Sequence, residues 1–411
     1  MSRRVVITGM GVISPIGNTV DEFWNGLKAG KCGVNMTTTF DTSDYDVKIS
    51  AEVKDFDEKN YMDKKIAKRM DRFSHFAVAA AVDALKMSGL DLESEDLNRF
   101  GTIVGSGIGS LGTIEEEEQK LLEKGPSRVS PMLIPKIITN IAAGNVAIRL
   151  GLKGICTTVV TACASGTNSI GEAYRAIQYG TCDVMFAGGT ESCVVPLGIA
   201  GFTSLTALST TTDPLNASRP FDKNRNGFVL GEGAGILILE ELEHALKRGA
   251  TILAEVSGYG STCDAYHITS PSPDGEGAAR CMEAAIKDGG INKEEVSYIN
   301  AHGTSTEYND KFETIAIKKV FGDYAYKIPI NSTKSMIGHL LGAAGAVESI
   351  ACIKSIQEDY IHPTINYETP DEDCDLDYVP NVGRKAVVNY ALTNSLGFGG
   401  HNASLLFKKY I

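Results

Sequence analysis

Apolar stretches rich in β-branched residues alternate with stretches of helical periodicity along the whole chain, and this alternation limits the possible folds more than any other feature. The first series of predicted strands is Val5–Thr8, Thr102–Gly105, Thr157–Thr161, Val184–Ala187 and Gly235–Glu240, all expected to be buried. The helices predicted between them are Val20–Ala29, Phe73–Ser88, Ile114–Glu123, Ala164–Tyr179 and Leu242–Lys247. Such alternation is typical of an α/β fold, in which helices cover mostly parallel sheets.

A second series of the same kind begins near Ile252. Its predicted strands are Ala254–Tyr259, Val296–Asn300, Ile328–Asn331, Val387–Thr393 and Ala403–Phe407, and its predicted helices are Gly277–Asp288, Phe312–Phe321 and Gly342–Gln357. Each series opens on an edge strand that ends in Gly-x-Gly, at Gly9–Gly11 and at Gly258–Gly260. This likeness indicates an internal duplication. We therefore predict an N-terminal half over residues 1–250 and a C-terminal half over residues 251–411.

The composition is that of an ordinary globular protein and argues against several classes of function. The 411 residues are 43% hydrophobic and 22% charged, which suits two domains or one large α/β unit. A net charge of −12 argues against nucleic-acid binding, and no apolar run is long enough to span a membrane. The chain opens on a strand rather than a signal peptide, and its nine cysteines contain no C-x-x-C pair. We therefore expect a cytoplasmic protein without a zinc or dithiol motif.

Cys163 is the strongest candidate for a functional side chain, because it lies between a predicted strand and a predicted helix. The strand Thr157–Thr161 leads into a turn of small residues, and the helix Ala164–Tyr179 begins in that turn. The unpaired N–H groups at a helix N-terminus favour the thiolate, which is the form that attacks carbonyl groups. The remaining cysteines have no such setting, and we interpret them as packing residues.

Two histidines follow predicted strands, at the end where α/β sheets assemble their sites. His302 follows the strand Val296–Asn300 in the segment Ala-His-Gly-Thr-Ser-Thr. His339 follows the strand Ile328–Asn331 and precedes a run of glycine and alanine. A lone histidine is more often structural than catalytic, but two histidines set among glycine and hydroxyl residues indicate partners for the cysteine. His267 and His401, near glycine-rich loops, are secondary candidates.

Four ordered motifs carry a resemblance to a known family. They are Thr161–Ser165 around the cysteine, Asn300–Thr306 and Lys334–Gly345 around the two histidines, and Asn394–Gly400 near the C-terminus. With these motifs the whole chain resembles the β-ketoacyl-[acyl-carrier-protein] synthases, above all the chain-elongating type II enzymes of bacterial fatty-acid synthesis. The resemblance implies the thiolase fold, in which two similar halves form a five-layer α/β/α/β/α core, usually as a homodimer.

The resemblance also implies a decarboxylating condensation. Cys163 would take an acyl group from a carrier-protein thioester, and the N–H groups of Cys163 and Phe398 would hold the oxyanion. A malonyl thioester would then lose CO₂, and His302 and His339, donating from Nε2, would stabilise the resulting enolate. The carbanion would attack the acyl group and give a 3-oxoacyl thioester. No metal or organic cofactor is expected for this reaction.

Several other residues match functional positions of the family. Thr304 and Thr306 match the positions that hydrogen-bond the phosphopantetheine arm. Phe398, followed by Gly399, matches the gate over the acyl pocket, and Ile108 matches a residue that lines this pocket across the dimer interface. The glycine cluster around Ile108 lacks the spacing of a dinucleotide fingerprint, so we reject a nucleotide site there.

The resemblance assigns supporting roles to buried polar residues. Lys334 would support the site electrostatically, paired with Glu348 on the helix that follows. In the family, Asn300, Glu348 and Asn394 lie near a buried structural cation.

One short basic segment matches the region of the family that binds acidic carrier protein. Its residues are Lys64, Lys65, Lys68, Arg69 and Arg72, and Arg128 is a weaker addition. Because the chain itself is acidic, docking of an acidic partner requires such a local positive patch.

Two departures from the family and one serious alternative accompany this interpretation. Leu396 and Glu307 stand where many relatives have phenylalanine and proline. A cysteine hydrolase, a thiolase, an initiating synthase or a chain-length-factor subunit each lacks part of the Cys-His-His set. A polyketide ketosynthase shares that set and is the remaining alternative.

Overall fold

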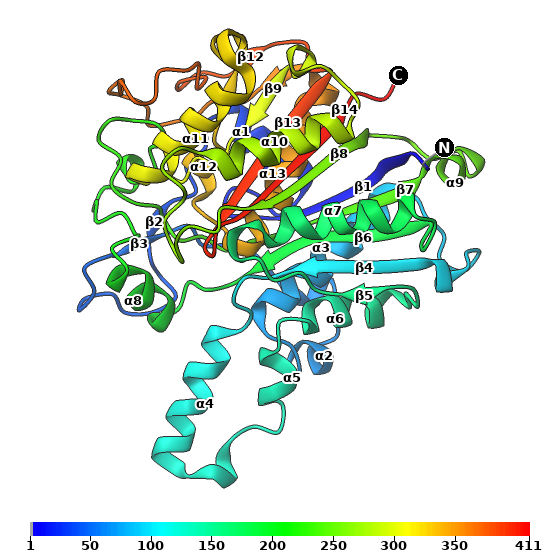
Figure 1. Ribbon diagram of the computed structural model, residues 1–411. Helices are drawn as coiled ribbons and strands as arrows, with labels where there is room; N and C mark the ends of the chain where they lie inside the picture. Colours follow the sequence, from blue (N-terminus) through cyan, green and yellow to red (C-terminus); the bar gives the residue numbers. More distant parts are fainter. Residues whose placement is uncertain (1–2) are drawn as a thin grey trace.

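The computed structural model describes residues 3–411, and a ten-stranded sheet is its largest element (Figure 1). The strands of the N-terminal half are β1 (Val5–Ile13), β4 (Phe100–Gly105), β5 (Cys156–Thr157), β6 (Val184–Glu191) and β7 (Gly233–Glu241). Those of the C-terminal half are β8 (Ala254–Cys263), β9 (Tyr298–Asn300), β10 (Ile330–Asn331), β13 (Tyr390–Gly397) and β14 (His401–Lys408). Two small sheets pair β2 (Asn35–Met36) with β3 (Ile49–Ser50) and β11 (Tyr360–Ile361) with β12 (Arg384–Lys385).

The two halves of the large sheet have the same strand order. The order is β1-β7-β6-β4-β5 in the first half and β8-β14-β13-β9-β10 in the second. In each half one strand, β7 or β14, runs against the other four. The halves join where β1 pairs antiparallel with β8, so the two strands predicted at edges lie in the middle of the whole sheet. The boundary predicted between residues 250 and 251 lies in the segment between α9 (Leu242–Lys247) and β8 and stays a prediction.

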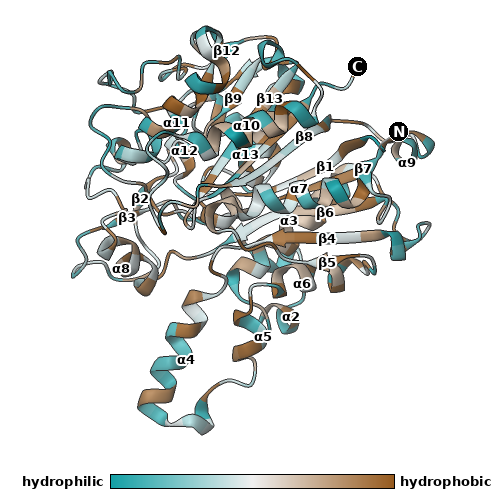
Figure 2. Cartoon of the chain, viewed as in Figure 1, coloured by the Kyte–Doolittle hydropathy of each residue, from teal (hydrophilic) through white to brown (hydrophobic). Residues whose placement is uncertain are grey.

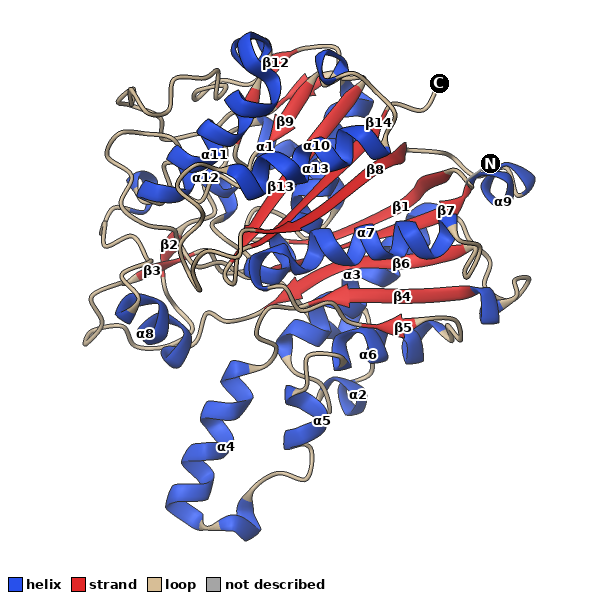
Figure 3. Ribbon diagram, in the orientation of Figure 1, coloured by secondary structure: helices blue, strands red, loops and turns tan. Residues whose placement is uncertain are grey.

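Helices form three layers around the two half-sheets (Figures 1 and 3). On the outer face of the N-terminal half lie α3 (Arg72–Ser88) and α6 (Ile141–Leu150). On the outer face of the C-terminal half lies α10 (Glu276–Asp288), with α11 (Glu307–Phe321) packed against it. Between the half-sheets, in contact with strands of both, lie α7 (Ser165–Gln178) and α13 (Ala344–Glu358). The layers are therefore α/β/α/β/α, as the resemblance implies.

The repeated Gly-x-Gly lets a helix pack closely on the first strand of each half. A Cβ on Gly11 would lie 1.9 Å from the carbonyl oxygen of Ala80 in α3. In the second half a Cβ on Gly260 would lie 2.1 Å from the carbonyl oxygen of Cys281 in α10. Only glycine permits such close approach of a helix backbone to a strand. The motif is thus a packing signature of the duplicated unit.

Two helices project from the body beside the β5 edge of the sheet (Figure 1). They are α4 (Leu111–Lys124) and α5 (Leu133–Ile137). Apolar residues appear on both helices in Figure 2, and Leu122 and Ile134 are 77% and 60% exposed. Exposed apolar side chains in such number are typical of a surface that binds another protein.

One predicted strand is wrong in length and in burial. Of the segment Thr157–Thr161 only Thr157 belongs to a strand, the two-residue β5, and both residues of β5 are exposed. The reason is position: β5 pairs only with β4 and forms the edge of the sheet, so its outer side has no partner within residues 3–411. The other predicted strands and helices are present, with ends shifted by a few residues.

Several short helices were not predicted. They include α2 (Lys64–Ala67), α5, α6, α8 (Pro196–Ser204) and α12 (Lys334–Ile337), whereas α1 (Val20–Lys28) and α9 (Leu242–Lys247) were. Most of these helices have fewer than three turns, so they show little apolar periodicity. In the described part of the chain, no helix has both the length and the apolar character that a membrane span requires.

Candidate functional site

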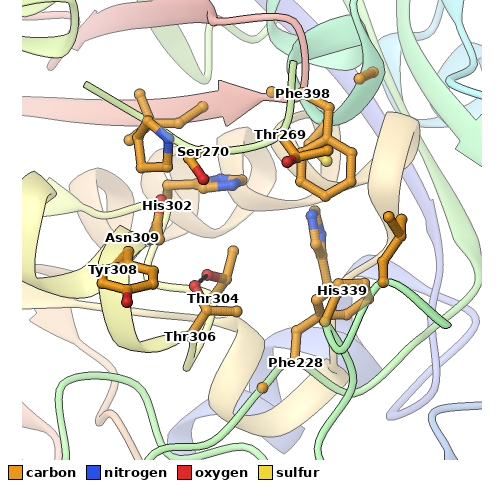
Figure 4. Close-up of a pocket in the computed structure, with 18 of the residues that line it drawn as sticks. Phe228, Thr269, Ser270, His302, Thr304, Thr306, Tyr308, Asn309, His339 and Phe398 are labelled. Carbon is orange, nitrogen blue, oxygen red and sulfur yellow. Dashed lines mark hydrogen bonds between the residues drawn. The ribbon is translucent and has the colours of Figure 1, made fainter. Parts of the chain in front are cut away.

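A cavity of about 610 Å³ brings the predicted catalytic residues together. It is lined by seven of the residues predicted from the sequence: Cys163, His302, His339, Thr304, Thr306, Ile108 and Phe398. In Figure 4 the rings of His302 and His339 point into the same space, with Phe398 across from them and the two threonines beside them. Segments more than two hundred residues apart in sequence therefore share one site.

A strained turn presents Cys163 to this cavity. The turn Ala162–Ala164 is a single 3-10 turn that leads directly into α7. Ala162 has a φ of +49°, in the left-handed region that residues with a Cβ rarely adopt. Ser165 closes the turn, because its Oγ accepts the N–H of Thr161 at 2.9 Å and donates to the Ala162 carbonyl at 2.6 Å.

Burial, rather than the N–H groups expected to favour the thiolate, decides the protonation of Cys163. Burial raises the pKa of the Cys163 thiol to about 12. The charge of Lys334 and hydrogen bonds from the backbone N–H groups of Phe398 and Cys163 lower the pKa, but desolvation outweighs them. The resting residue is thus a neutral thiol at neutral pH. The same two N–H groups are the predicted oxyanion donors, and both act at the sulfur.

Both histidines are buried and neutral. His302 and His339 are 2% and 3% exposed, and their ring centroids lie 5.3 Å apart with an interplanar angle of 85°. Burial, with the nearby charge of Lys334, lowers the pKa of each imidazole well below its ordinary value. Each ring therefore carries one proton, and its neighbours decide which nitrogen holds it.

Those neighbours place the proton on Nε2 in both rings. The ammonium of Lys334 lies 3.3 Å from Nδ1 of His302, so this nitrogen accepts. The backbone N–H of Leu341 lies 3.2 Å from Nδ1 of His339, which also accepts. Both Nε2–H groups remain donors. Two neutral donors suit an enolate oxygen, as predicted from the sequence.

Glu313 holds the His302 segment in place. Its carboxylate accepts the N–H groups of His302 and Gly303 at 2.8 and 2.9 Å. Burial raises the pKa of this carboxyl to about 7. We missed Glu313 in the sequence, where the available signal was a carboxylate in helical spacing with the apolar residues Ala316, Ile317 and Val320 on the buried face of α11.

Lys334 lies behind His302 rather than in the cavity wall, and it forms the predicted ion pair. Its Nζ is 2.5 Å from Oε1 of Glu348, and both side chains are almost fully buried. A buried pair of this kind is sensitive to loss of either partner.

Two oxygens near this pair fit a cation. Oδ1 of Asn300 and Oε2 of Glu348 are buried and have no hydrogen-bond partner within residues 3–411. Amide and carboxylate oxygens are the ligands that hard cations take. The third expected residue, Asn394, fits less well, because its Oδ1 accepts a hydrogen bond from Ser404 at 2.8 Å.

The gate segment is a glycine-rich turn between β13 and β14. Gly399 and Gly400 have φ of +87° and +77°, so both use the left-handed region. The N–H of Gly399 donates to the Ile268 carbonyl at 2.8 Å, which ties the turn to the loop after β8. Phe398 lines the cavity, whereas Gly399 does not. Leu396, the departure from the family, also lines it.

The predicted pantetheine contacts lie together at the cavity. The hydroxyl oxygens of Thr304 and Thr306 are 2.9 Å apart. Arg225, which we did not predict, holds this segment in place. Its guanidinium donates to the carbonyl oxygens of Thr306 and Glu307 at 3.2 and 2.9 Å. The Glu307 departure therefore lies at the cavity lining itself.

The predicted docking residues lie outside the cavity. Lys64, Lys65, Lys68 and Arg69 are exposed on and just after α2. Arg72 is not available for docking in the same way, because its guanidinium forms a bidentate ion pair with Glu232 at 2.7 and 3.0 Å. Its charge is therefore largely neutralised by Glu232, and its part in docking stays a prediction. Arg128 is exposed at the tip of the α4–α5 projection, apart from the others.

The secondary histidine candidates do not line the cavity. His267 is exposed, and its Nδ1 accepts the N–H groups of Thr269 and Ser270 at 3.1 Å. His401 begins β14, paired with Gly397. Both residues flank the gate turn and the loop that contacts it.

Known proteins resemble this chain over its whole length. Residues 2–245 match the family model of the β-ketoacyl synthase N-terminal domain, and residues 253–368 match that of the C-terminal domain. A 3-oxoacyl-[acyl-carrier-protein] synthase 2 of Synechocystis sp. is 54% identical over 99% of this chain and 98% of its own length. A relative of the same name from Staphylococcus aureus is 51% identical over 100% of this chain and 99% of its own.

Solved structures of the same fold cover the chain completely. The ishigamide ketosynthase/chain length factor is 40% identical with a TM-score of 0.95, and both chains are covered in full. A type II polyketide ketosynthase in complex with its acyl-carrier protein is 38% identical, also over both full chains, with a TM-score of 0.91. The thiolase fold, the motifs and these full-length matches agree, and the chain belongs to the β-ketoacyl synthase family.

Proposed function

We propose that this protein catalyses the decarboxylating Claisen condensation of malonyl-[acyl-carrier protein] with an acyl group held on Cys163, in fatty-acid chain elongation. One observation carries the proposal: a single cavity joins one thiol to two neutral imidazoles whose Nε2–H groups are free to donate. A thiol can hold an acyl group, and two neutral donors can stabilise an enolate.

In the first half-reaction the Cys163 sulfur attacks the acyl thioester of the carrier protein. The new sulfur–carbon bond forms as the bond to the pantetheine sulfur breaks, and the thiol proton passes to that leaving sulfur. One neutral thiol replaces another, which suits a cysteine whose pKa is raised to about 12. The N–H groups of Cys163 and Phe398 stabilise the tetrahedral oxyanion, each by roughly 3 kcal/mol.

In the second half-reaction the malonyl thioester loses CO₂, and the bonding electrons move onto the thioester oxygen as an enolate. The Nε2–H groups of His302 and His339 donate to that oxygen. The enolate carbon then attacks the acyl carbonyl, and Cys163 leaves and takes up a proton. The product is a 3-oxoacyl thioester on the carrier protein. The wall of the cavity includes Phe228, whose ring centroid lies 5.2 Å from that of His339. This apolar wall keeps water from the enolate.

For the supporting residues we propose the roles that the family resemblance implies. Thr304 and Thr306 bind the pantetheine arm, Phe398 with Gly399 gates the acyl pocket, and Ile108 lines it. Lys334 keeps His302 in the donor tautomer, and Asn300 and Glu348 are the oxygens that would hold a structural cation. The catalytic steps use none of these oxygens.

Acyl carrier protein is the proposed partner, and the reaction is placed in the cytoplasm. One solved relative is a ketosynthase in complex with its acyl-carrier protein, which supports this kind of partner. The exposed group Lys64, Lys65, Lys68 and Arg69 supplies the positive charge that an acidic partner requires.

A condensation assay tests the proposed function and its polyketide alternative together. Purified protein is mixed with malonyl-carrier protein and a ladder of acyl-carrier proteins, and products are read by mass spectrometry. We expect products longer by two carbons and complete loss of condensation in Cys163→Ala. Turnover of the wild-type kind in that variant would disprove the mechanism. An acylated Cys163 without extension of fatty acyl chains would favour a polyketide ketosynthase, the class to which the 38% identical solved structure belongs.

We also propose that the protein is a homodimer, joined at the β5 edge. Ile148 on α6 and Val160 after β5 are 79% and 51% exposed beside this edge, and β5 has an unpaired side that can add a strand. Light scattering on a sizing column should give twice the chain mass. Ile148→Lys should shift the protein toward monomer. Val382→Lys, at an equally exposed position beside β12, should not. Equal behaviour of both variants would place the interface elsewhere.

A further inference from the structure

A buried carboxylate outside the proposed catalytic set joins the acyl-pocket segment to the His339 segment. Glu191 ends β6 and is 0% exposed. Among residues 3–411 it has no cationic partner. Its carboxylate instead accepts one long hydrogen bond from the Cys193 thiol at 3.8 Å and five shorter ones, from four backbone N–H groups and one hydroxyl. The donors are Ser106 Oγ at 2.8 Å, Gly107 N at 2.7 Å, Ile108 N and Gly109 N at 3.2 Å each, and Gly342 N at 3.0 Å.

The two carboxylate oxygens of Glu191 have different partners. Oε1 accepts Ser106, Ile108 and Gly109, all in the segment that carries the acyl-pocket residue Ile108, and also the thiol of Cys193, two residues after Glu191. Oε2 accepts Gly107 from that segment and Gly342 from the turn after His339. The two segments touch under this oxygen, because a Cβ on Gly342 would lie 2.4 Å from the Gly107 nitrogen. A single side chain therefore fixes the relative position of both.

The Gly342 bond reaches His339 through one residue. The N–H of Leu341, the residue before Gly342, is the donor that keeps Nδ1 of His339 an acceptor. Movement of this turn would remove the Leu341 donor. The His339 proton would then no longer be held on Nε2, where it can donate to the enolate. The other end of the Glu191 network reaches Ile108, whose backbone position sets one wall of the cavity.

We propose that Glu191 is a positioning residue that aligns the acyl pocket with the decarboxylation site, through the Ile108 segment on one oxygen and the His339 turn on the other. The inference rests on the proposed condensation function. Glu191 touches neither carrier-protein docking residues nor the pantetheine contacts, so its effect falls on the chemical steps and on acyl-chain selection rather than on carrier binding.

Glu191→Gln is the sharpest substitution. An amide of the same shape has one acceptor oxygen, whereas both carboxylate oxygens are in use. In either orientation an NH₂ group faces backbone N–H donors, so one of the two segments must move. Displacements on this scale cost on the order of 10- to 100-fold in rate. We expect that loss in the kcat for long acyl chains, with the KM for malonyl-carrier protein changed less than about twofold.

Ser106→Ala separates the two arms of the network. The Ser106 hydroxyl donates to Oε1 and accepts the N–H of Gly109 at 3.1 Å, so its loss loosens only the Ile108 segment. Acylation of Cys163 from palmitoyl-carrier protein should slow relative to acylation from hexanoyl-carrier protein. CO₂ release from a preloaded hexanoyl-enzyme should keep the wild-type rate. In Glu191→Gln both measurements should fall.

Glu52→Gln is the matched control. Glu52 is also buried and has no cationic hydrogen-bond partner within residues 3–411. It accepts the N–H groups of Thr38 and Thr39 at 2.7 and 3.1 Å, and none of its hydrogen-bond partners lines the cavity. A parallel loss of activity and melting temperature in Glu52→Gln and Glu191→Gln would show a general effect on folding and overturn the proposal.

The proposal would also be overturned if Glu191→Gln kept both the wild-type chain-length profile and the wild-type rate of CO₂ release. If Glu191→Gln does not fold, an unchanged palmitoyl-to-hexanoyl ratio in Ser106→Ala overturns the proposal. If the wild-type enzyme itself forms acyl-Cys163 without condensation, the proposed function fails, and the acylation ratio still decides the role of Glu191 in the acyl pocket.

Discussion

His302 and His339 share a cavity but depend on different groups for their protonation. The Lys334 ammonium sets the tautomer of His302, and a backbone N–H sets that of His339. The desolvation that lowers both imidazole pKa values also keeps the rings neutral over the physiological range. At the residue scale the chemistry is therefore determined by what each ring nitrogen touches.

His302→Ala and His339→Ala should each block decarboxylation while Cys163 still accepts an acyl group. Each substitution removes one enolate donor, and loss of one such donor costs on the order of 10²–10³ in rate. Intact-protein mass spectrometry measures the acyl-enzyme, and labelled CO₂ measures decarboxylation. If either variant loses both half-reactions while its melting temperature is unchanged, that histidine acts in acyl transfer as well.

At the scale of elements, the Lys334–Glu348 pair connects α12 to α13 and so connects the His302 support to the central helical layer. Neither side chain has water to solvate it, since their exposures are 1% and 0%. The net energy of the ion pair is small, but the loss of one partner leaves the other charge buried and unpaired, which is strongly destabilising.

Lys334→Met should destabilise the protein by about 3–5 kcal/mol, because it leaves the Glu348 carboxylate buried without its cation. The double variant Lys334→Met/Glu348→Gln should recover much of that stability. It should not recover CO₂ release, because Nδ1 of His302 still lacks its donor. Chemical denaturation and the CO₂ assay on the same three proteins check this. If the double variant recovered both the unfolding free energy and the rate of CO₂ release, Lys334 would be a structural residue only.

Over the whole molecule, histidines act on acid stability in opposite directions. Burial lowers the pKa of His362 from 6.5 to about 4. Hydrogen bonds from His244 to Glu240 and Glu95 raise the pKa of His244 above 6.5. The stability that depends on neutral His362 is present above the unfolded pKa of 6.5 and is lost as pH falls towards the folded pKa of about 4. The stability that depends on protonated His244 is fully present below 6.5 and is lost as pH rises through the folded value.

His362→Gln should flatten the fall of unfolding free energy between pH 6.5 and pH 4. The unfolded wild-type chain takes up a proton in that window and the folded chain does not, which costs on the order of 3 kcal/mol by pH 4. His244→Gln should act above that window: it should remove the gain in unfolding free energy that the wild type shows as pH falls through the raised folded pKa of His244 to 6.5. Guanidinium unfolding at a series of pH values gives the slopes. Parallel curves for wild type and His362→Gln would mean that His362 is already protonated in the folded state.

Local chemistry explains how much could be predicted. The strand and helix alternation, the repeated Gly-x-Gly and the Cys163, His302 and His339 motifs were all legible, because periodicity and small residues act over a few neighbours. The Lys334–Glu348 pair was predicted from the family resemblance, and the structure contains it.

Only the tertiary structure decided the rest, because it depends on groups distant in sequence. The raised pKa of Cys163 comes from burial by both halves, which no local motif encodes. The short, exposed β5 follows from its place at the sheet edge, and the ion pair of Arg72 follows from Glu232, which lies far along the chain. Glu191 is the clearest case: its five nitrogen and oxygen donors come from segments that meet only when the two half-sheets close around the central helices.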